Sequence, residues 1–216
     1  MEEESKAYGK SDLAGLVRSE YGVSGFKDLR NTKDEVKKIE KTLVDNGFSV
    51  KAYLGSKGNA ESFVALDGKS PSIVHIATHG FYYTPDEAKD KDFLRGYTDA
   101  MSLSGLVFAG GNAVWLGKKN VDGVLGGVLT AKDIANLDFK GTDLLVLSAC
   151  KTGQGKVTAE GVFGLQRAFK KAGVGTIIMS LWNVDDKVTS EFMIAFYEQL
   201  TDKANNWNKR KAFEQM

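Results

Sequence analysis

Two residues with catalytic chemistry each follow a short apolar run in this sequence. His79 comes directly after residues 72–77 and Thr78, and it is followed by Gly80. Cys150, the single cysteine, follows residues 143–148 and Ala149. Apolar runs of this length, bounded by turn residues, are typical of strands buried in a parallel sheet. Because ligands bind beyond the carboxyl ends of such strands, the two side chains would share one edge of the sheet if their strands are neighbours.

A cysteine and a histidine at one sheet edge could perform acyl transfer, most simply the hydrolysis of a peptide bond. A free thiol has a pKa of about 8.5 and needs a nearby base to attack at neutral pH. The His79 imidazole could take that proton. The backbone amides of Gly80 and Cys150 could form an oxyanion hole. The alternative is that Cys150 is only a small buried apolar residue and that His79 is structural.

Other ligand chemistries are less well supported by the sequence. His75 and His79 have the spacing of a helical metal pair, but their β-branched surroundings indicate a strand, in which four residues span about 13 Å. The carboxylate of an HExxH motif is also missing. The glycine-rich stretches at 110–111, 123–127 and 153–155 do not match a phosphate-binding pattern. We therefore expect neither a metal nor an organic cofactor.

Composition narrows the class of protein further. The chain has 216 residues, which is the size of one domain, and a formal net charge of +1, which predicts direct binding neither to nucleic acid nor to a membrane surface. No apolar run is long enough for a membrane span, and the acidic start is unlike a signal peptide. One cysteine excludes an internal disulfide framework. We expect a cytoplasmic protein.

Apolar strands alternating with amphipathic helices predict an α/β fold, specifically a three-layer α/β/α sandwich with a mostly parallel sheet. A capping box at Thr32 and Glu35 predicts a helix that buries Val36, Ile39, Leu43 and Val44 and ends at Gly47. Further helices are expected at 59–67, at 130–137, where Thr130 and Asp133 form the start, and at 161–172, which ends at Gly173. A last helix begins at Asp185 or Asp186. Its apolar side consists of Phe192, Met193, Phe196, Tyr197 and Leu200. Strands are expected at 48–54, 72–77, 103–109, 143–148 and 175–181, and a surface excursion at 81–101.

Four motifs make the family recognisable. They are VHIATHG at 74–80, LLVLSACKTGQG at 144–155, EGVFGLQRAF at 160–169 and SLWNVDD at 180–186. In this order they resemble the CHAT domain, a family of caspase-like cysteine peptidases that is related to separase and often attached to TPR repeats. The resemblance runs from about residue 26 to the end, after a loosely patterned lead-in at 1–25. We expect the domain to be incomplete at one or both ends.

The resemblance implies a caspase-type fold and assigns roles to individual residues. It carries the catalytic histidine onto His79 and the nucleophile onto Cys150, with Gly80 and Cys150 supplying the oxyanion amides. Glu160 and Asp186 match recurrent family positions near the substrate cleft. An acidic pocket would favour Lys or Arg substrates, and Glu160, Asp185 or Asp186 could supply it. Each of the three could equally be a helix-start carboxylate.

These observations predict a cysteine endopeptidase that cleaves a protein or peptide substrate through a Cys–His dyad. A TPR region or a regulatory protein outside this chain would control it. The alternative from a different class is a catalytically silent, caspase-like scaffold or signalling module that binds other proteins. Cleavage limited to self-processing is a third option that the sequence does not separate from the first.

Overall fold

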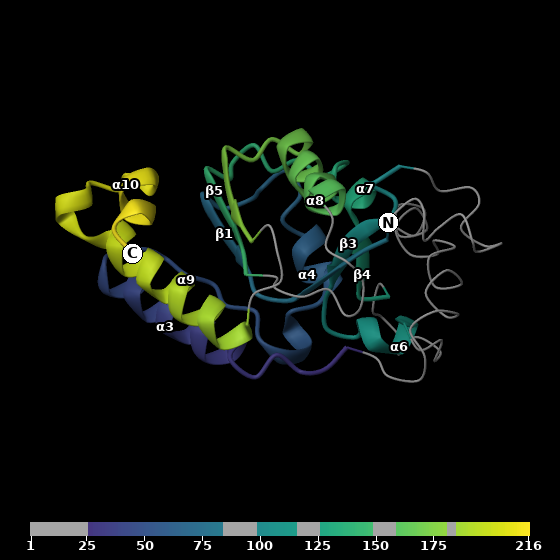
Figure 1. Cartoon of the computed structure of the whole chain (residues 1–216), viewed down its shortest axis with the longest axis horizontal. Coiled ribbons are helices and arrows are strands. Elements are labelled where there is room, and N and C mark those ends of the chain that lie inside the picture. Colours follow the sequence, from purple (N-terminus) through teal and green to yellow (C-terminus); the bar gives the residue numbers. More distant parts are fainter. Residues whose placement is uncertain (1–25, 84–98, 116–125, 149–158, 181–184) are drawn as a thin grey trace. The chain divides into compact units, whose positions relative to one another are not determined.

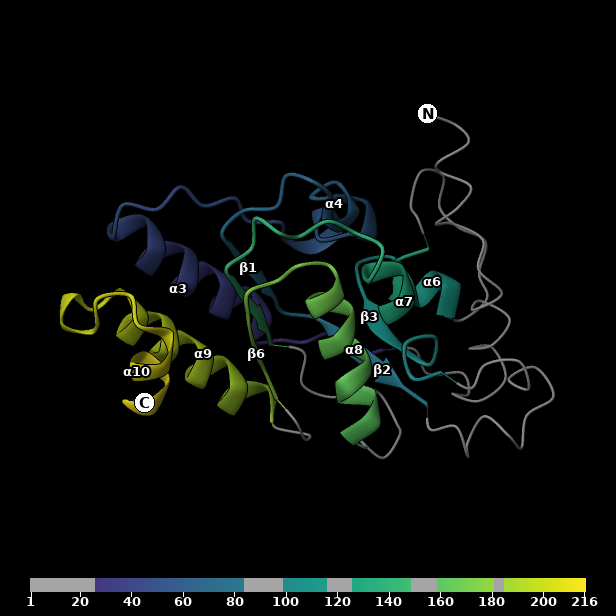
Figure 2. The same cartoon turned by 90° about the horizontal axis from the view of Figure 1, so that it is seen from above.

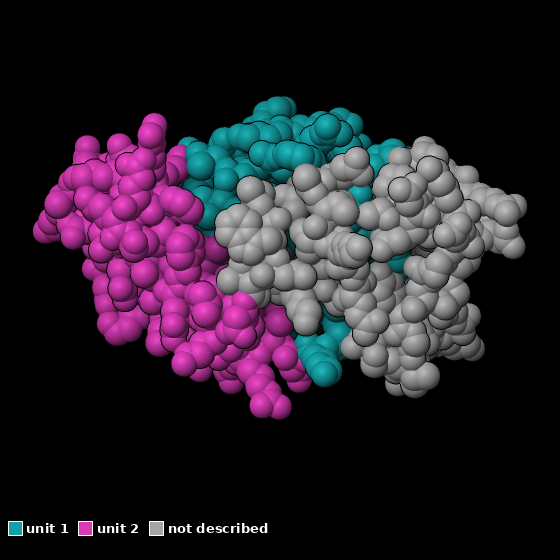
Figure 3. Space-filling model, viewed as in Figure 1, with its two compact units in different colours: residues 1–27, 55–183 teal, residues 28–54, 184–216 magenta. Residues whose placement is uncertain are grey.

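The computed structural model describes residues 26–83, 99–115, 126–148, 159–180 and 185–216. The chain divides into two compact units, shown in different colours in Figure 3. The first unit comprises residues 1–27 and 55–183, and the second comprises residues 28–54 and 184–216. Within the described segments, no helix combines the length and the apolar character needed to cross a membrane.

A parallel sheet forms the centre of the first unit. Its strands β1 (Ile73–Ile76), β5 (Leu144–Leu147) and β6 (Thr176–Met179) lie in the order β1-β5-β6. All four residues of β5 are buried, as expected for the middle strand of a parallel sheet. At the start of the sheet, the Thr142 hydroxyl donates to the Pro71 carbonyl at 2.9 Å. The strands predicted at 72–77, 143–148 and 175–181, and with them the α/β class, are therefore confirmed.

A second, antiparallel sheet was not predicted. It consists of β2 (His79–Tyr82), β3 (Ser104–Val107) and β4 (Val128–Thr130), in the order β2-β3-β4. The predicted strand at 103–109 contains β3. The prediction that the chain leaves the core at residue 81 was wrong, because Phe81, Tyr82 and Tyr83 are at most 5% exposed. These aromatic residues pair and pack with β3, whereas the sequence pattern was dominated by the charged stretch at 84–98, which lies outside the described residues.

In the part of the chain that the structure describes, four helices accompany the strands of the first unit, and local hydrogen bonds define several of their ends. These helices are α4 (Ala60–Val64), α6 (Gly111–Trp115), α7 (Ala131–Ile134) and α8 (Ala159–Lys171), with a 3-10 turn at Gly55–Lys57. The predicted capping box of Thr130 and Asp133 is present at the start of α7. The Gly173 amide donates to Lys170 and the Val174 amide donates to Phe169, so α8 ends in a Schellman motif at Gly173, which has a φ of +102°.

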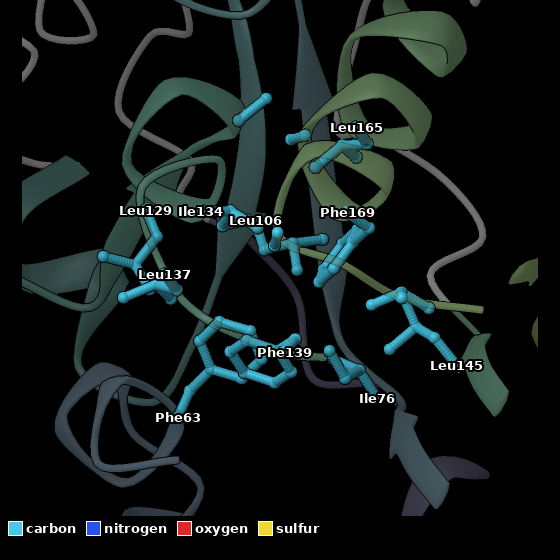
Figure 4. Packing of buried hydrophobic residues seen from close by; sticks show 14 of the residues in the cluster. Phe63, Ile76, Leu106, Leu129, Ile134, Leu137, Phe139, Leu145, Leu165 and Phe169 are labelled. Atoms are coloured by element: carbon cyan, nitrogen blue, oxygen red, sulfur yellow. The ribbon is translucent and has the colours of Figure 1, made fainter. Parts of the chain in front are cut away.

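The main core of the first unit lies on one face of the parallel sheet. Figure 4 shows Phe63 of α4 beside Phe139, and their ring centroids are 5.1 Å apart. Phe169 of α8 meets the edge of the Phe63 ring at 6.3 Å. Side chains from strands of both sheets fill the space around these rings, among them Ile76, Leu106, Leu129 and Leu145. One continuous core therefore supports both the parallel and the antiparallel sheet.

The second unit is helical. Its helices α3 (Thr32–Asp45) and α9 (Asp186–Thr201) lie side by side in both Figure 1 and Figure 2. A 3-10 turn at Lys203–Asn205 leads into α10 (Lys209–Glu214), which packs on α9. The predicted apolar side of α9 is buried at Met193, Phe196, Tyr197 and Leu200. Phe192 is instead 37% exposed and meets Phe213 of α10 edge-on.

The start of α3 differs from the prediction. Thr32 forms no capping box, because Asn31 is the N-cap residue and the Thr32 hydroxyl donates to the Leu29 carbonyl at 2.8 Å. Val44 is 52% exposed, while Glu35 is buried on the helix face that meets Tyr197. Burial, to which the nearby Glu35 carboxylate adds, raises the pKa of the Tyr197 hydroxyl. The predicted burial of Ile39 and Leu43 is confirmed, whereas Val44 is exposed and Glu35 is buried in place of Val36, which is only half-buried.

Residues 48–54 do not form the predicted strand. Alternation of apolar and polar residues supplies one buried face, but a strand also needs a partner for its backbone groups. In this segment Phe48 stacks on Trp207 instead, with ring centroids 4.7 Å apart. The helix end before it is as predicted, since Gly47 has a φ of +85° and completes a Schellman motif with Phe48.

Candidate active site

The strands that lead to the two predicted catalytic residues are neighbours in the parallel sheet. β1 and β5 pair in register, with Ile76 opposite Leu147. The Ser148 amide donates to the Ile76 carbonyl at 2.9 Å, so the pairing continues past the end of β5. In the sequence, His79 is the third residue after Ile76, and Cys150 is the third residue after Leu147. The condition that the two strands be adjacent is met, while Cys150 itself lies outside the described residues.

His79 is the first residue of β2 and not part of a loop. It lies opposite Val107 of β3, and the preceding Thr78 hydroxyl donates to the Val107 carbonyl. The imidazole is half-buried, and its Nε2 atom is 2.6 Å from the backbone oxygen of Lys27. A carbonyl oxygen can only accept, so Nε2 carries the hydrogen. In the neutral ring, the lone pair is then on Nδ1.

Phe26 and Lys27, which precede helix α3 in the sequence, contact the His79 imidazole. The Phe26 ring lies over His79, with centroids 5.0 Å apart and planes inclined by 35°. Asn112 of α6 holds Phe26 by two hydrogen bonds, accepting from the Phe26 amide at 2.7 Å and donating to its carbonyl at 2.8 Å. Sequence reasoning missed Phe26, Lys27 and Asn112. A backbone carbonyl leaves no signal in the sequence, and the only clue was an aromatic residue within a polar stretch.

The Gly80 amide is directed away from β3. In an antiparallel ladder, hydrogen-bonded pairs alternate with non-bonded pairs. The Tyr83 amide donates to the Leu103 carbonyl at 2.8 Å, which makes the pair of His79 and Val107 a bonded one and the pair of Gly80 and Leu106 a non-bonded one. Among the strands of the described residues, β2 lies at the edge of its sheet, so the Gly80 N–H points away from β3, to the outer side of that edge.

The three carboxylates predicted to bind the substrate give less support to their predicted role. Asp185 caps α9, accepting from the amides of Lys187 at 2.9 Å and Val188 at 3.3 Å. Asp186 accepts from the Asn31 side chain at 2.7 Å and from its amide at 3.2 Å. Asp185 therefore caps its own helix, whereas Asp186, the first residue of α9, binds the residue that precedes α3. Glu160 falls in the first turn of α8, and its side chain is not among those described.

The described part of the chain contains no group of three or more His, Cys, Asp or Glu side chains arranged to hold a metal ion. What this site presents is a histidine whose Nε2–H is engaged by a carbonyl, followed by an outward-facing amide at the edge of β2. Such groups are suited to moving a proton and to stabilising negative charge on oxygen.

These features define an α/β protein with a parallel sheet and with a histidine and a cysteine placed after adjacent strands. The profile of the CHAT domain matches residues 11–215, so the chain belongs to the CHAT domain family, which is caspase-like and related to peptidases. The described α/β structure is compatible with that fold.

Two curated relatives carry the name tetratricopeptide repeat protein 28. The human protein is 40% identical over 73 residues, and the mouse protein is 38% identical over 73 residues. Each match covers 34% of this chain but only 3% of the relative's own length. The predicted association of the family with TPR repeats agrees with these names. No solved structure gave a significant match.

Proposed function

We propose that this chain is a cysteine endopeptidase domain in which Cys150 is the nucleophile and His79 is the general base and acid. The observation that carries this proposal is the register of β1 and β5, which pairs Ile76 with Leu147. His79 and Cys150 each follow that pair by three residues. Adjacent strands are about 4.8 Å apart, so two residues at equal distances beyond a paired position start from neighbouring points of one sheet edge.

In the proposed reaction His79 first accepts the proton of the Cys150 thiol. The thiolate attacks the carbonyl carbon of the scissile bond, and the electron pair of the C=O bond moves onto oxygen. When the C–N bond breaks, the imidazolium gives its proton to the departing amine. Water then attacks the thioester with His79 again as base, which releases the acid product and restores the thiol.

The contact with Lys27 supports this role of the imidazole. Because Nε2 donates to the Lys27 carbonyl, Nδ1 is the ring atom that accepts the thiol proton. The same carbonyl would stabilise the imidazolium formed in the first step, as the aspartate of a Ser–His–Asp triad does for its histidine. A backbone carbonyl needs no deprotonation, so this support would be present at any pH at which the protein is folded.

The oxyanion would be bound by the backbone amides of Gly80 and Cys150. The outward direction of the Gly80 amide at the edge of β2 supports the first half of this assignment. A donor already in position before the reaction costs no reorganisation when charge develops on oxygen. An alanine at position 80 would still have a backbone N–H. The proposed oxyanion contact therefore does not depend on residue 80 being glycine.

The substrate would be a protein or peptide, cleaved in the cytoplasm without a metal or an organic cofactor. One of Glu160, Asp185 or Asp186 is the proposed acidic group for a Lys or Arg side chain. Asp185 or Asp186 would have to bind it while keeping the hydrogen bonds that each already makes. The TPR name of the relatives supports control by a TPR region or another regulatory protein outside this chain.

The test is alkylation of the single thiol by iodoacetamide across a range of pH. A dyad predicts a Cys150 pKa below the usual value of about 8.5, and a rise towards that value in His79→Ala. Cleavage of a peptide library should then be lost in both His79→Ala and Cys150→Ala. Cleavage of added peptides, rather than of the chain alone, excludes a purely self-processing enzyme.

The competing function is a catalytically silent module that binds other proteins, and the TPR name of the relatives is the observation that favours it. In that case the thiol reacts identically in the wild type and in His79→Ala, and no peptide is cleaved. That pair of results would replace the peptidase with an interaction domain of the same fold.

A further inference from the structure

The Asn112 side chain matches the backbone of Phe26 at two points. Its Oδ1 accepts from the Phe26 amide at 2.7 Å, and its Nδ2 donates to the Phe26 carbonyl at 2.8 Å. A carboxamide offers one acceptor and one donor side by side, which is what the N–H and C=O of a single residue require. Phe26 and Asn112 are 86 positions apart in the sequence, so this pairing joins two distant segments of the first unit.

We propose that Asn112 is a positioning residue for His79, a role that rests on the proposed peptidase function. Asn112 touches neither a reacting atom nor the imidazole in this assignment. It holds Phe26, whose ring lies over His79, and thereby holds the next residue, Lys27, whose carbonyl accepts from Nε2. Two contacts on the histidine thus depend on one side chain.

The contacts form a closed circuit that includes β3. His79 pairs with Val107 on one side. Beyond Val107 the chain turns through Gly110 and Gly111 to reach Asn112. Asn112 then returns to His79 through Phe26 and Lys27. Each link is a hydrogen bond, a ring contact or a short stretch of chain. The imidazole and the residues that support it, Phe26 and Lys27, are therefore both connected to strand β3.

The turn before Asn112 is tightly packed. Gly110 has a φ of +89°, a conformation that favours glycine. A Cβ on Gly111 would lie 2.5 Å from Cγ1 of Val107 and 2.9 Å from the carbonyl oxygen of Gly127. Close packing on both sides leaves the turn little freedom to shift. Asn112 is itself exposed, so its substitution removes the two bonds without emptying the core.

The variant that isolates this role is Asn112→Asp. It has nearly the same shape, but it loses the Nδ2 donor and places a carboxylate oxygen opposite the Phe26 carbonyl. The matched control is Asn136→Asp, because Asn136 is an exposed asparagine of the same unit, just after α7. Both substitutions change the net charge by the same amount, so an effect seen only in Asn112→Asp does not come from net charge and is attributed to the two bonds between Asn112 and Phe26. Circular dichroism checks that both variants are folded.

The first measurement is the NMR signal of the imidazole Nε2–H of His79. The chain has two histidines, and loss of one signal in His79→Ala assigns it. The proton held by Lys27 should exchange slowly with water in the wild type and in Asn136→Asp. In Asn112→Asp it should broaden and disappear. This readout does not depend on any enzymatic activity.

The second measurement is the kinetics of peptide cleavage. Misplacing a catalytic group or losing an orienting partner costs about 10- to 100-fold in rate. We expect kcat to fall by that factor in Asn112→Asp while KM changes less than about threefold, because substrate contacts are unaffected. Asn136→Asp should retain wild-type kinetics.

The outcomes separate this inference from the proposed function. A protected Nε2–H signal that is lost in Asn112→Asp but kept in Asn136→Asp, in a protein that cleaves no peptide, would uphold the positioning of His79 and remove the peptidase. Cleavage by Asn112→Asp at the wild-type rate, an unchanged signal in that variant, or no protected signal in the wild type would each overturn the role of Asn112.

Discussion

Replacing Gly105 by alanine should destabilise the sheet that carries His79. Gly105 lies in β3 opposite Phe81 of β2 and Thr130 of β4. A Cβ at this position would be 2.6 Å from two atoms of the Phe81 ring and even closer to the Leu129 carbonyl oxygen. Phe81 is only 2% exposed, so its ring has no free space into which it could move. Gly80 is the matched control, since its added Cβ would be 3.5 Å from the nearest atom, the Gly105 carbonyl oxygen.

The expected magnitude follows from these contacts. Overpacking a core position costs about 1–3 kcal/mol, and the upper end applies here because one obstacle is backbone. Alanine recovers about 0.5–1 kcal/mol relative to glycine within a strand. We therefore expect Gly105→Ala to lose about 2 kcal/mol of unfolding free energy. A domain of this size would then melt about 4–8 °C lower. Gly80→Ala meets only ordinary contacts and should change stability by less than about 1 kcal/mol.

Urea unfolding followed by circular dichroism measures both variants against the wild type. Equal slopes of the three transitions would show that the same surface is exposed in each. The steric reasoning is refuted if Gly105→Ala unfolds at the wild-type midpoint, or if Gly80→Ala loses as much stability. A loss confined to Gly105→Ala would establish that the spacing of β2 and β3, which places His79 opposite Val107, depends on the missing side chain.

Three further predictions concern the core, a helix cap and pH. Phe63→Ala should cost about 3–5 kcal/mol in urea unfolding, because the Phe63 ring contacts three other phenylalanine rings; a loss below about 1 kcal/mol would contradict this packing. Asp185→Ala should cost about 0.5–2 kcal/mol and Asp185→Asn only a few tenths, and loss of cleavage after Lys or Arg in both variants at unchanged stability would instead indicate substrate binding. Burial opposes ionisation of Asp99, but hydrogen bonds from Ser102 and the Met101 amide outweigh it and hold its pKa below the ordinary 3.8. A carboxyl group whose pKa is lower in the folded than in the unfolded protein contributes stability that is present above the unfolded-state pKa and is lost as pH falls through the folded-state pKa; Asp99→Asn should therefore lower Tm more at neutral pH than in strong acid, and an equal decrease at both would disprove the linkage.

Much of the α/β framework can be predicted from patterns among residues that are close in the sequence. The three strands of the parallel sheet are continuous apolar runs, and the middle strand β5 is buried on both faces. The starts of α4, α7 and α9 depend on Asn59, Thr130 and Asp185, whose side-chain oxygens accept from amides two or three residues ahead. Such bonds join residues close in sequence, so they can be predicted without knowing the fold.

The errors fall where a partner distant in sequence decides the outcome. Residues 48–54 alternate like a strand but have no strand assigned to them. The charged stretch after residue 83 obscured β2, which exists because β3 pairs with it. At the start of α3 the predicted capping box of Thr32 was absent, and Asn31 is held by Asp186 from 155 positions away. Long-range contacts contribute in each case, through Trp207 at Phe48, β3 at β2 and Asp186 at Asn31, and local pattern cannot supply them.

In the candidate site, too, some features follow from local sequence and others from contacts between distant residues. The sequence by itself determined the residue types, His79 and Cys150, their places after two buried strands, and the family to which the chain belongs. Only the tertiary structure decided that those strands are neighbours in register, that Gly80 directs its amide outward, and that the Lys27 carbonyl and Asn112 support the imidazole. The physical reason is that side-chain chemistry is encoded residue by residue. Backbone donors and acceptors are the same at almost every position, so folding alone selects which of them reach the site.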